Sequence, residues 1–140
     1  MVSLELCKDE IKFSSIEQYM MYKKAELFQD MEICSQILET SNIGKIKVLG
    51  RSVKKYDDTV WSGVRQIIVY EGLLEKFSQN QEFKQRLLET GPNILAECAV
   101  QNRVWGIGLS MKDDKRFHME DWQGQNLLGF ALMMVRGSLE

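Results

Sequence analysis

A carboxylate and an amine lie on one face of a predicted helix near the start of the chain. Glu17 and Lys24 are seven residues apart, about 700° around a helix at roughly 100° per residue. Met21 and Phe28 complete the stripe, and apolar surroundings move the pKa of both groups toward neutrality. Such a pair suits general acid–base catalysis or attack by a neutral amine. The alternative is that both groups face solvent and another stripe forms the core: Ile16, Tyr19, Met20 and Leu27.

Two further clusters combine aromatic, glycine and amide residues. Trp105 stands before Gly106 and Gly108, where glycines let the backbone approach a ligand and the indole offers a stacking face. A core tryptophan in a tight turn is the alternative. Asn126 follows the run from Trp122 to Gln125. It either caps the last helix, the commoner role for asparagine there, or binds a ligand near the helix N-terminus.

The remaining reactive residues exclude several classes of enzyme. His118 is the only histidine, so a Ser/His/Asp triad would require it and a site of several histidines cannot form. The cysteines Cys7, Cys34 and Cys98 are odd in number and lack metal-ligand spacing, which predicts free thiols. No phosphate-binding loop or dinucleotide-binding glycine motif occurs. We expect neither a metal nor an organic cofactor.

Length and composition predict one globular domain over residues 1–140. Apolar residues make up 44% of the 140 and charged residues 27%, and the net charge of −2 gives no reason to expect general binding to nucleic acid or membrane surfaces. No apolar run approaches the roughly 18 residues of a membrane span and no signal peptide is apparent. We therefore expect a cytoplasmic protein without a membrane partner. Residues 139–140 resemble a cloning remnant and are left out of the fold prediction.

The elements that would position these residues are mainly helices. Apolar periodicity and capping residues predict helices at about 15–29, from Asp30, at 42–53, from Asp57 to Ser78, at 81–89 and at 125–136. The apolar segments 94–99 and 103–109 are predicted as short strands or extended loops. The predicted fold class is mainly α with a minor β component (α+β), in one compact domain.

Taken together, the motifs resemble the YbiA-like family, which is the NADAR domain. Their order and spacing agree over about residues 12–136. The matching motifs are Ser15 to Ala25, Leu49-Gly50-Arg51, Trp61, Lys76 to Asn80, Thr90-Gly91, Leu95-Ala96-Glu97, Trp105 to Gly108, and Trp122 to Gly129.

The resemblance implies a mostly helical domain that hydrolyses the N-glycosidic bond of a ribosylated base. The implied substrates are phosphoribosyl-aminopyrimidine intermediates of riboflavin synthesis or ADP-ribosylated guanosine, free or in nucleic acid. Glu17 and Lys24 fall on the family's glutamate and lysine and are the implied catalytic residues. The implied substrate-binding residues are Arg51, Trp61, Asn102, Trp105, Gly106, Gly108, Asn126 and Gly129.

Two mechanisms are open for these residues. Glu17 would stabilise an oxocarbenium-like transition state while Lys24 forms a Schiff base with the opened ribose. Alternatively, a charged Lys24 would bind phosphate and Glu17 would act with water. In either mechanism, Trp61 or Trp105 would stack on the base or flank the sugar, and Arg51 is a candidate for phosphate.

Two departures from the family pattern favour a non-catalytic module that binds ADP-ribose or a related nucleotide. The family usually opens with a Ser-Asn-Phe/Trp-Tyr motif, which Met1 to Glu10 lacks. Many members carry an aspartate three residues before the tryptophan of the W-G-x-G motif, where this chain has Asn102.

Overall fold

The computed structural model describes residues 6–140, which fall into two compact units, one ending at Asn80 and the other beginning at Gln81. Both units are dominated by helices, and the described chain contains one two-stranded sheet. The predicted α+β class is confirmed. No helix among residues 6–140 is long and apolar enough to cross a membrane.

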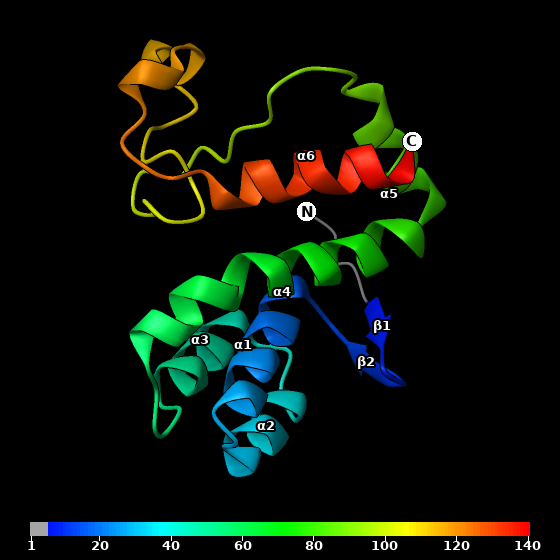
Figure 1. Cartoon of the computed structure of the whole chain (residues 1–140), viewed down its shortest axis with the longest axis vertical. Coiled ribbons are helices and arrows are strands. Elements are labelled where there is room, and N and C mark those ends of the chain that lie inside the picture. Colours follow the sequence, from blue (N-terminus) through cyan, green and yellow to red (C-terminus); the bar gives the residue numbers. More distant parts are fainter. Residues whose placement is uncertain (1–5) are drawn as a thin grey trace. The chain divides into compact units, whose positions relative to one another are not determined.

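The first unit consists of a β-hairpin followed by four helices. Strands β1 (Leu6–Lys8) and β2 (Ile11–Phe13) pair antiparallel, with Leu6 opposite Phe13. The helices, coloured from blue to green in Figure 1, are α1 (Ile16–Leu27), α2 (Met31–Leu38), α3 (Ile43–Arg51) and α4 (Asp58–Ser78).

Helix α1 is the centre of this unit, since it contacts α2, α3 and α4. Two glycines permit the close approach of its neighbours. A Cβ on Gly50 of α3 would overlap the side chain of Met21, and a Cβ on Gly72 of α4 would lie 2.5 Å from the ring of Tyr19. Side chains larger than hydrogen would push either helix away from α1.

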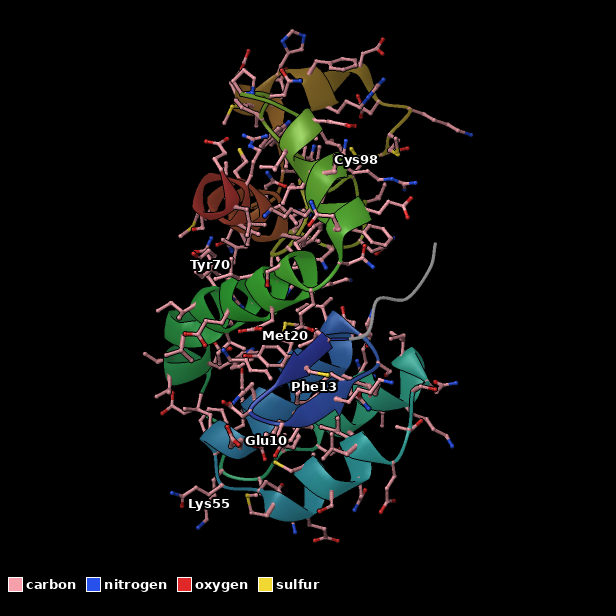
Figure 2. The ribbon with its side chains drawn as sticks, turned by 90° about the vertical axis from the view of Figure 1, so that its right-hand side faces the viewer. Glu10, Phe13, Met20, Lys55, Tyr70 and Cys98 are labelled. Atoms are coloured by element: carbon pink, nitrogen blue, oxygen red, sulfur yellow. The ribbon has the colours of Figure 1, made fainter. Side chains whose placement is uncertain are left out.

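Aromatic rings join the hairpin to α1. Phe13, labelled in Figure 2, packs edge-on against Tyr19 and Tyr22, with ring centroids 5.2 and 5.3 Å away. The side-chain amide of Gln79 continues the edge of β1: it accepts from the backbone N–H of Cys7 and donates to its carbonyl oxygen. The hairpin is therefore held by α1 on one side and by the end of α4 on the other.

Two buried polar side chains fix the helix connections. Gln18 of α1 donates to the carbonyls of Ile37 and Thr40 at the end of α2. Asp30 caps α2 by accepting from Ile33 N and also accepts from Lys54 N beyond α3. The N–H groups of Lys54 and Ile33 lower the pKa of the Asp30 carboxyl against the opposing effect of burial.

The second unit contains α5 (Gln81–Glu89), a long connection and α6 (Leu127–Leu139), which packs against α5. The connection, yellow-green to orange in Figure 1, includes two short 3₁₀ helices, Asp114–Phe117 and Met119–Asp121. Buried Arg136 of α6 donates to the hydroxyl of Thr90 and the carbonyl of Asn93. The end of α5 is thereby tied to α6.

All six predicted helices are confirmed. Of the two forms predicted for 94–99 and 103–109, the loop is observed and the short strand is not. Segments 94–99 and 103–109 form irregular loop and turns, while the strands are β1 and β2. Segment 103–109 takes that form because the carbonyl oxygens of 103–107 accept from N–H groups of residues 123–128, while the N–H groups of Val104, Trp105 and Ile107 donate elsewhere, so no ladder forms. Leu139, which was set aside as a cloning remnant, lies within α6.

The hairpin turn gives a test of local strain. Asp9 and Glu10 both have positive φ, 52° and 66°, as in the two-residue turns that favour Asp-Gly. Glu10 lies at the tip of the hairpin (Figure 2), and its positive φ is energetically unfavourable because the residue has a Cβ. We expect Glu10→Gly to raise the free energy of unfolding by about 0.5–1 kcal/mol in denaturant titration.

Glu10→Ala is the matched control, because it removes the same side chain but keeps the Cβ. Equal stabilisation by both substitutions would show that the charge of Glu10, not its backbone conformation, is unfavourable.

Candidate active site

Lys24 lies in an aromatic enclosure in the first unit. It belongs to the last turn of α1, and its Nζ is 4.5 Å from the ring centroid of Tyr56 and 5.7 Å from that of Trp61. Phe28 packs edge-on against Tyr56 with centroids 5.5 Å apart. The amine is therefore half-buried against ring faces and is only partly solvated.

This environment lowers the pKa of Lys24. Burial is the main cause, the positive charge of Arg51 acts in the same direction, and the carboxylate of Asp58 opposes them. The ring faces of Tyr56 and Trp61 also oppose the shift, since they attract the charged ammonium. The amine of Lys24 therefore loses its proton at a lower pH than the amine of an ordinary surface lysine.

The adjacent lysine has the opposite electrostatics. Lys23 Nζ lies 3.1 Å from a carboxylate oxygen of Glu26 and 3.6 Å from one of Asp9. Burial lowers the pKa of Lys23, but the hydrogen bonds and charges of these two carboxylates outweigh it and raise the pKa overall. One helix thus carries neighbouring lysines of which one is held charged and the other is biased toward neutrality.

Glu17 lies in the first turn of the same helix and is half-buried. Seven residues at about 1.5 Å each place it roughly 10 Å from Lys24 along the axis. The two groups are too far apart along the helix for direct pairing unless both side chains bend toward each other. Within residues 6–140 no ion pair or hydrogen bond engages the Glu17 carboxylate. Both groups are half-buried, and the core side of α1 includes Tyr19 and Met20 of the alternative stripe as well as Met21.

Trp61 and Tyr56, the two rings beside Lys24, differ in their exposure to solvent. Trp61 is 6% exposed, so its ring contacts protein and supports Lys24. Tyr56 is 42% exposed and donates from its hydroxyl to Asp58 Oδ1 at 2.6 Å. Burial and this hydrogen bond raise the pKa of Tyr56 to about 12, which keeps the phenol neutral. Of these two rings, Tyr56 has the face available to a ligand.

Tyr56 and Asp58 were missed in the sequence analysis. They precede and begin α4, where no apolar periodicity marks them. The only available signal was their i, i+2 spacing beside the capping residue Asp57.

The other predicted residues lie in the second unit, around the segment Trp105-Gly106-Ile107-Gly108. The carbonyl of Trp105 accepts from Leu128 N at 3.1 Å and that of Gly106 accepts from Asn126 N at 3.0 Å. A Cβ on Gly106 would lie 2.9 Å from two carbonyl oxygens, and Gly108 has a φ of +74°. Both glycines are required by the backbone itself, and Trp105 is half-buried beside them.

Asn126 is neither a side-chain cap nor an exposed polar group. It is fully buried, adopts φ 54° and ψ 38°, and caps no N–H of α6 with its side chain. Its amide accepts from Glu97 N at 2.9 Å and donates to Leu95 O at 2.8 Å. Gly129 provides the space, because a Cβ there would overlap Leu95 O. These residues fix segment 95–97 on α6; direct contact with substrate stays a prediction.

The side chain of Asn102 also bonds to backbone groups close to it in the sequence. Its side-chain oxygen accepts from Val104 N at 3.1 Å and from Trp105 N at 2.9 Å, which sets the turn before the tryptophan. The residue is exposed. The structure thus places the predicted residues in two sets, one in each unit.

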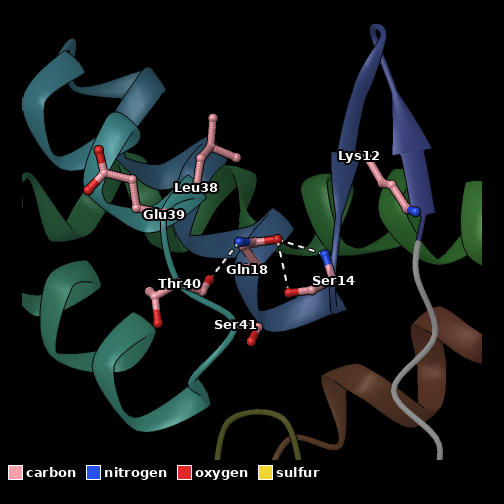
Figure 3. A pocket seen from close by; sticks show the side chains of 7 residues that line it. All are labelled: Lys12, Ser14, Gln18, Leu38, Glu39, Thr40 and Ser41. Carbon is pink, nitrogen blue, oxygen red and sulfur yellow. Dashed lines mark hydrogen bonds between the residues drawn. The ribbon is translucent and has the colours of Figure 1, made fainter.

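A polar pocket of about 370 Å³ in the first unit contains none of the predicted site residues. Figure 3 shows Gln18 at its centre, bonded to Ser14 and to the carbonyl of Thr40. Because its amide is already satisfied, Gln18 has a structural role. No group of three or more metal-ligating side chains occurs among residues 6–140. The pocket is lined by Lys12, Ser14, Gln18, Leu38, Glu39, Thr40 and Ser41.

Comparison with known proteins gives related sequences along nearly the whole chain. The N-glycosidase R617 of Acanthamoeba polyphaga mimivirus is 43% identical over 125 residues, covering 89% of this chain and 74% of that protein. Protein irg-1 of Caenorhabditis elegans is 40% identical over 131 residues, covering 92% and 62%. The N-glycosidase YbiA of Escherichia coli is 29% identical over 118 residues, covering 84% and 67%.

The fold also has a solved relative. The NMR structure of the E. coli protein YbiA matches with a TM-score of 0.79 at 26% identity, covering 98% of this chain and 73% of that one. Residues 2–140 match the NADAR domain. With its central glutamate–lysine helix and this match along its length, the chain belongs to the NADAR domain family.

Proposed function

We propose that this protein is an N-glycosidase that hydrolyses the bond between a ribose and a base. The observation that carries the proposal is Lys24, half-buried on ring faces with a lowered pKa, on the same helix as a glutamate that no residue of 6–140 pairs with. The names N-glycosidase R617 and N-glycosidase YbiA support the reaction class, and a relative in Vibrio vulnificus is called a riboflavin biosynthesis protein.

Glu17 supplies the negative charge that the reaction needs. Breaking a ribosyl C–N bond builds positive charge on the sugar, and a carboxylate near it stabilises that transition state. Glu17 has no protein cation to neutralise it within the described chain. Its charge is therefore available to the substrate.

Lys24 acts as a nucleophile on the opened ribose. Its neutral amine adds to C1 of the sugar, the base nitrogen leaves with a proton, and a Schiff base to Lys24 remains. Water then adds to the imine and releases the sugar aldehyde and the free amine. The sum is the addition of one water across the N-glycosidic bond, with Lys24 regenerated.

Arg51 and Tyr56 bind the remainder of the substrate. Arg51 ends α3 and is exposed, and its charge acts on Lys24. An exposed guanidinium whose charge acts on the amine suits a phosphate or diphosphate on the sugar. The substrates we favour are phosphoribosyl-aminopyrimidines and ADP-ribosylated guanosine, including guanosine in nucleic acid.

A non-catalytic module for ADP-ribose is the second candidate. It is favoured by Asn102, which brings no carboxylate before Trp105 and whose oxygen is used within its own turn. Binding of ADP-ribose without release of any base from either substrate class would support this function.

The first test is turnover. We expect the protein to release the base from one of the two substrate classes, as followed by mass spectrometry, and expect Glu17→Gln to slow this by about 10²- to 10⁴-fold. The substitution removes charge with little change in volume, so the melting temperature should hold. A folded Glu17→Gln protein that works at the wild-type rate would remove Glu17 from the mechanism.

The covalent step has its own prediction. Borohydride added during turnover should leave a sugar-derived mass increment on the peptide at Lys24, and Lys24→Arg should be inactive, since arginine keeps the charge but not the nucleophile. Lys23, held charged by Glu26 and Asp9, is the neighbouring control. Lys76, whose pKa burial also lowers, controls for chance reaction with released sugar. Activity in Lys24→Arg with no adduct would exclude the Schiff base.

Removing the charge of Arg51 and removing the charge of Asp58 should shift the pH dependence of activity in opposite directions. Arg51 lowers the pKa of Lys24 and Asp58 raises it. Arg51→Met should therefore raise that pKa and move the rise of activity to higher pH, whereas Asp58→Asn should lower the pKa and move it to lower pH. The pKa is measured by NMR on 13C-methylated lysines. Shifts of the same sign in both variants would contradict this electrostatic scheme.

A further inference from the structure

The second unit contains a hollow that no predicted site residue lines. Its volume is about 350 Å³, and it lies between segment 94–98 and the two 3₁₀ helices. Apolar groups dominate its wall, with one guanidinium and one thiol, from Cys98, labelled in Figure 2. The lining residues are Ile94, Ala96, Cys98, Arg116, Phe117, Met119 and Trp122.

The wall presents flat surfaces in fixed positions. Arg116 lies over the ring of Phe117, with its Cζ 4.1 Å from the centroid, and donates from Nη1 to Asp113 O. The indole N–H of Trp122 donates to Arg116 O at 2.9 Å, and the indole packs on Phe130. Phe117 and Trp122 are therefore both oriented through Arg116.

Exposure of this wall is unfavourable without a ligand. Phe117 is 70% exposed, and Ile94 and Met119 are exposed as well. Burying a side chain of this size gains about 1.5–3 kcal/mol. Pockets of 300–1,000 Å³ with apolar and aromatic walls and a few polar groups are the usual form of small-molecule sites.

The surrounding charge defines which ligands fit. The segment 113–121 carries four carboxylates against Lys115 and Arg116, and Arg116 also has Asp114 at 3.6 Å. This excess of negative charge disfavours phosphate. The ring face of Phe117, held in place by the guanidinium plane of Arg116, favours a flat π system.

We propose that this hollow is a binding site for a neutral planar aromatic heterocycle of nucleobase size. The ring stacks on the face of Phe117 that the Arg116 guanidinium does not cover, and phosphate stays outside. The proposal is independent of N-glycosidase activity, since it concerns residues to which no step of hydrolysis is assigned.

The test follows the indole N–H signal of Trp122 by 15N NMR, assigned with Trp122→Phe, during titration with adenosine, adenosine monophosphate and cyclohexanol. We expect adenosine to move the signal at least as readily as the monophosphate, and cyclohexanol to leave it in place. Phe117→Ala and Phe117→Leu should weaken the adenosine response by about 5- to 150-fold. Phe117 is mostly exposed, so both variants should fold.

Met111→Ala is the matched control, because Met111 is 72% exposed in the same unit but does not line the hollow. It should respond as the unmodified protein does. A Trp122 signal that adenosine does not move, a response equal in Phe117→Ala and Met111→Ala, or a stronger response to the monophosphate would each overturn the proposal.

Discussion

The packing of α1 against three helices is the constraint on which the first unit depends. Gly50 and Gly72 let α3 and α4 approach so closely that a Cβ at either position would overlap α1 side chains. This contact buries Tyr19, Met20 and Met21 while leaving Glu17 and Lys24 half-exposed along one edge. A helix held on most sides keeps its remaining side chains in place, which suits groups that must meet a substrate in one geometry.

The same packing separates the chemistry of two neighbouring lysines. A rotation of about 100° between adjacent residues of a helix turns Lys23 toward Glu26 and Asp9 and Lys24 toward Tyr56 and Trp61. Burial lowers the pKa of both amines, but only Lys23 has carboxylates close enough to reverse the effect. The direction in which each side chain leaves the helix thus decides whether the pKa of its amine is raised or lowered.

The sequence predicts the helices well because their start signals are local. Ser15, Asp30, Asn42 and Asp57 each accept from backbone N–H groups in the first turn of the helix that follows. The hairpin was missed because its turn is Asp9-Glu10, which lacks the glycine that usually marks such a turn. Tyr56 was missed because its contact with Lys24 depends on how two helices pack, and periodicity contains no information on that packing.

Two motif residues of the second unit, Asn126 and Gly129, have a structural role that residue type alone does not predict. Asn126 and Gly129 are predicted to contact ligand, and the structure shows a further role for them, which is to hold Leu95 and Glu97 on α6. A buried asparagine amide has both a donor and an acceptor to satisfy, and an unpaired one would cost about 1–3 kcal/mol. Two backbone groups on one extended segment satisfy both at once, provided that the residue one turn later has no Cβ. The asparagine and the glycine therefore meet a single requirement together, and the segment that they fix extends the network, because Glu97 O accepts from Ile107 N at 2.8 Å.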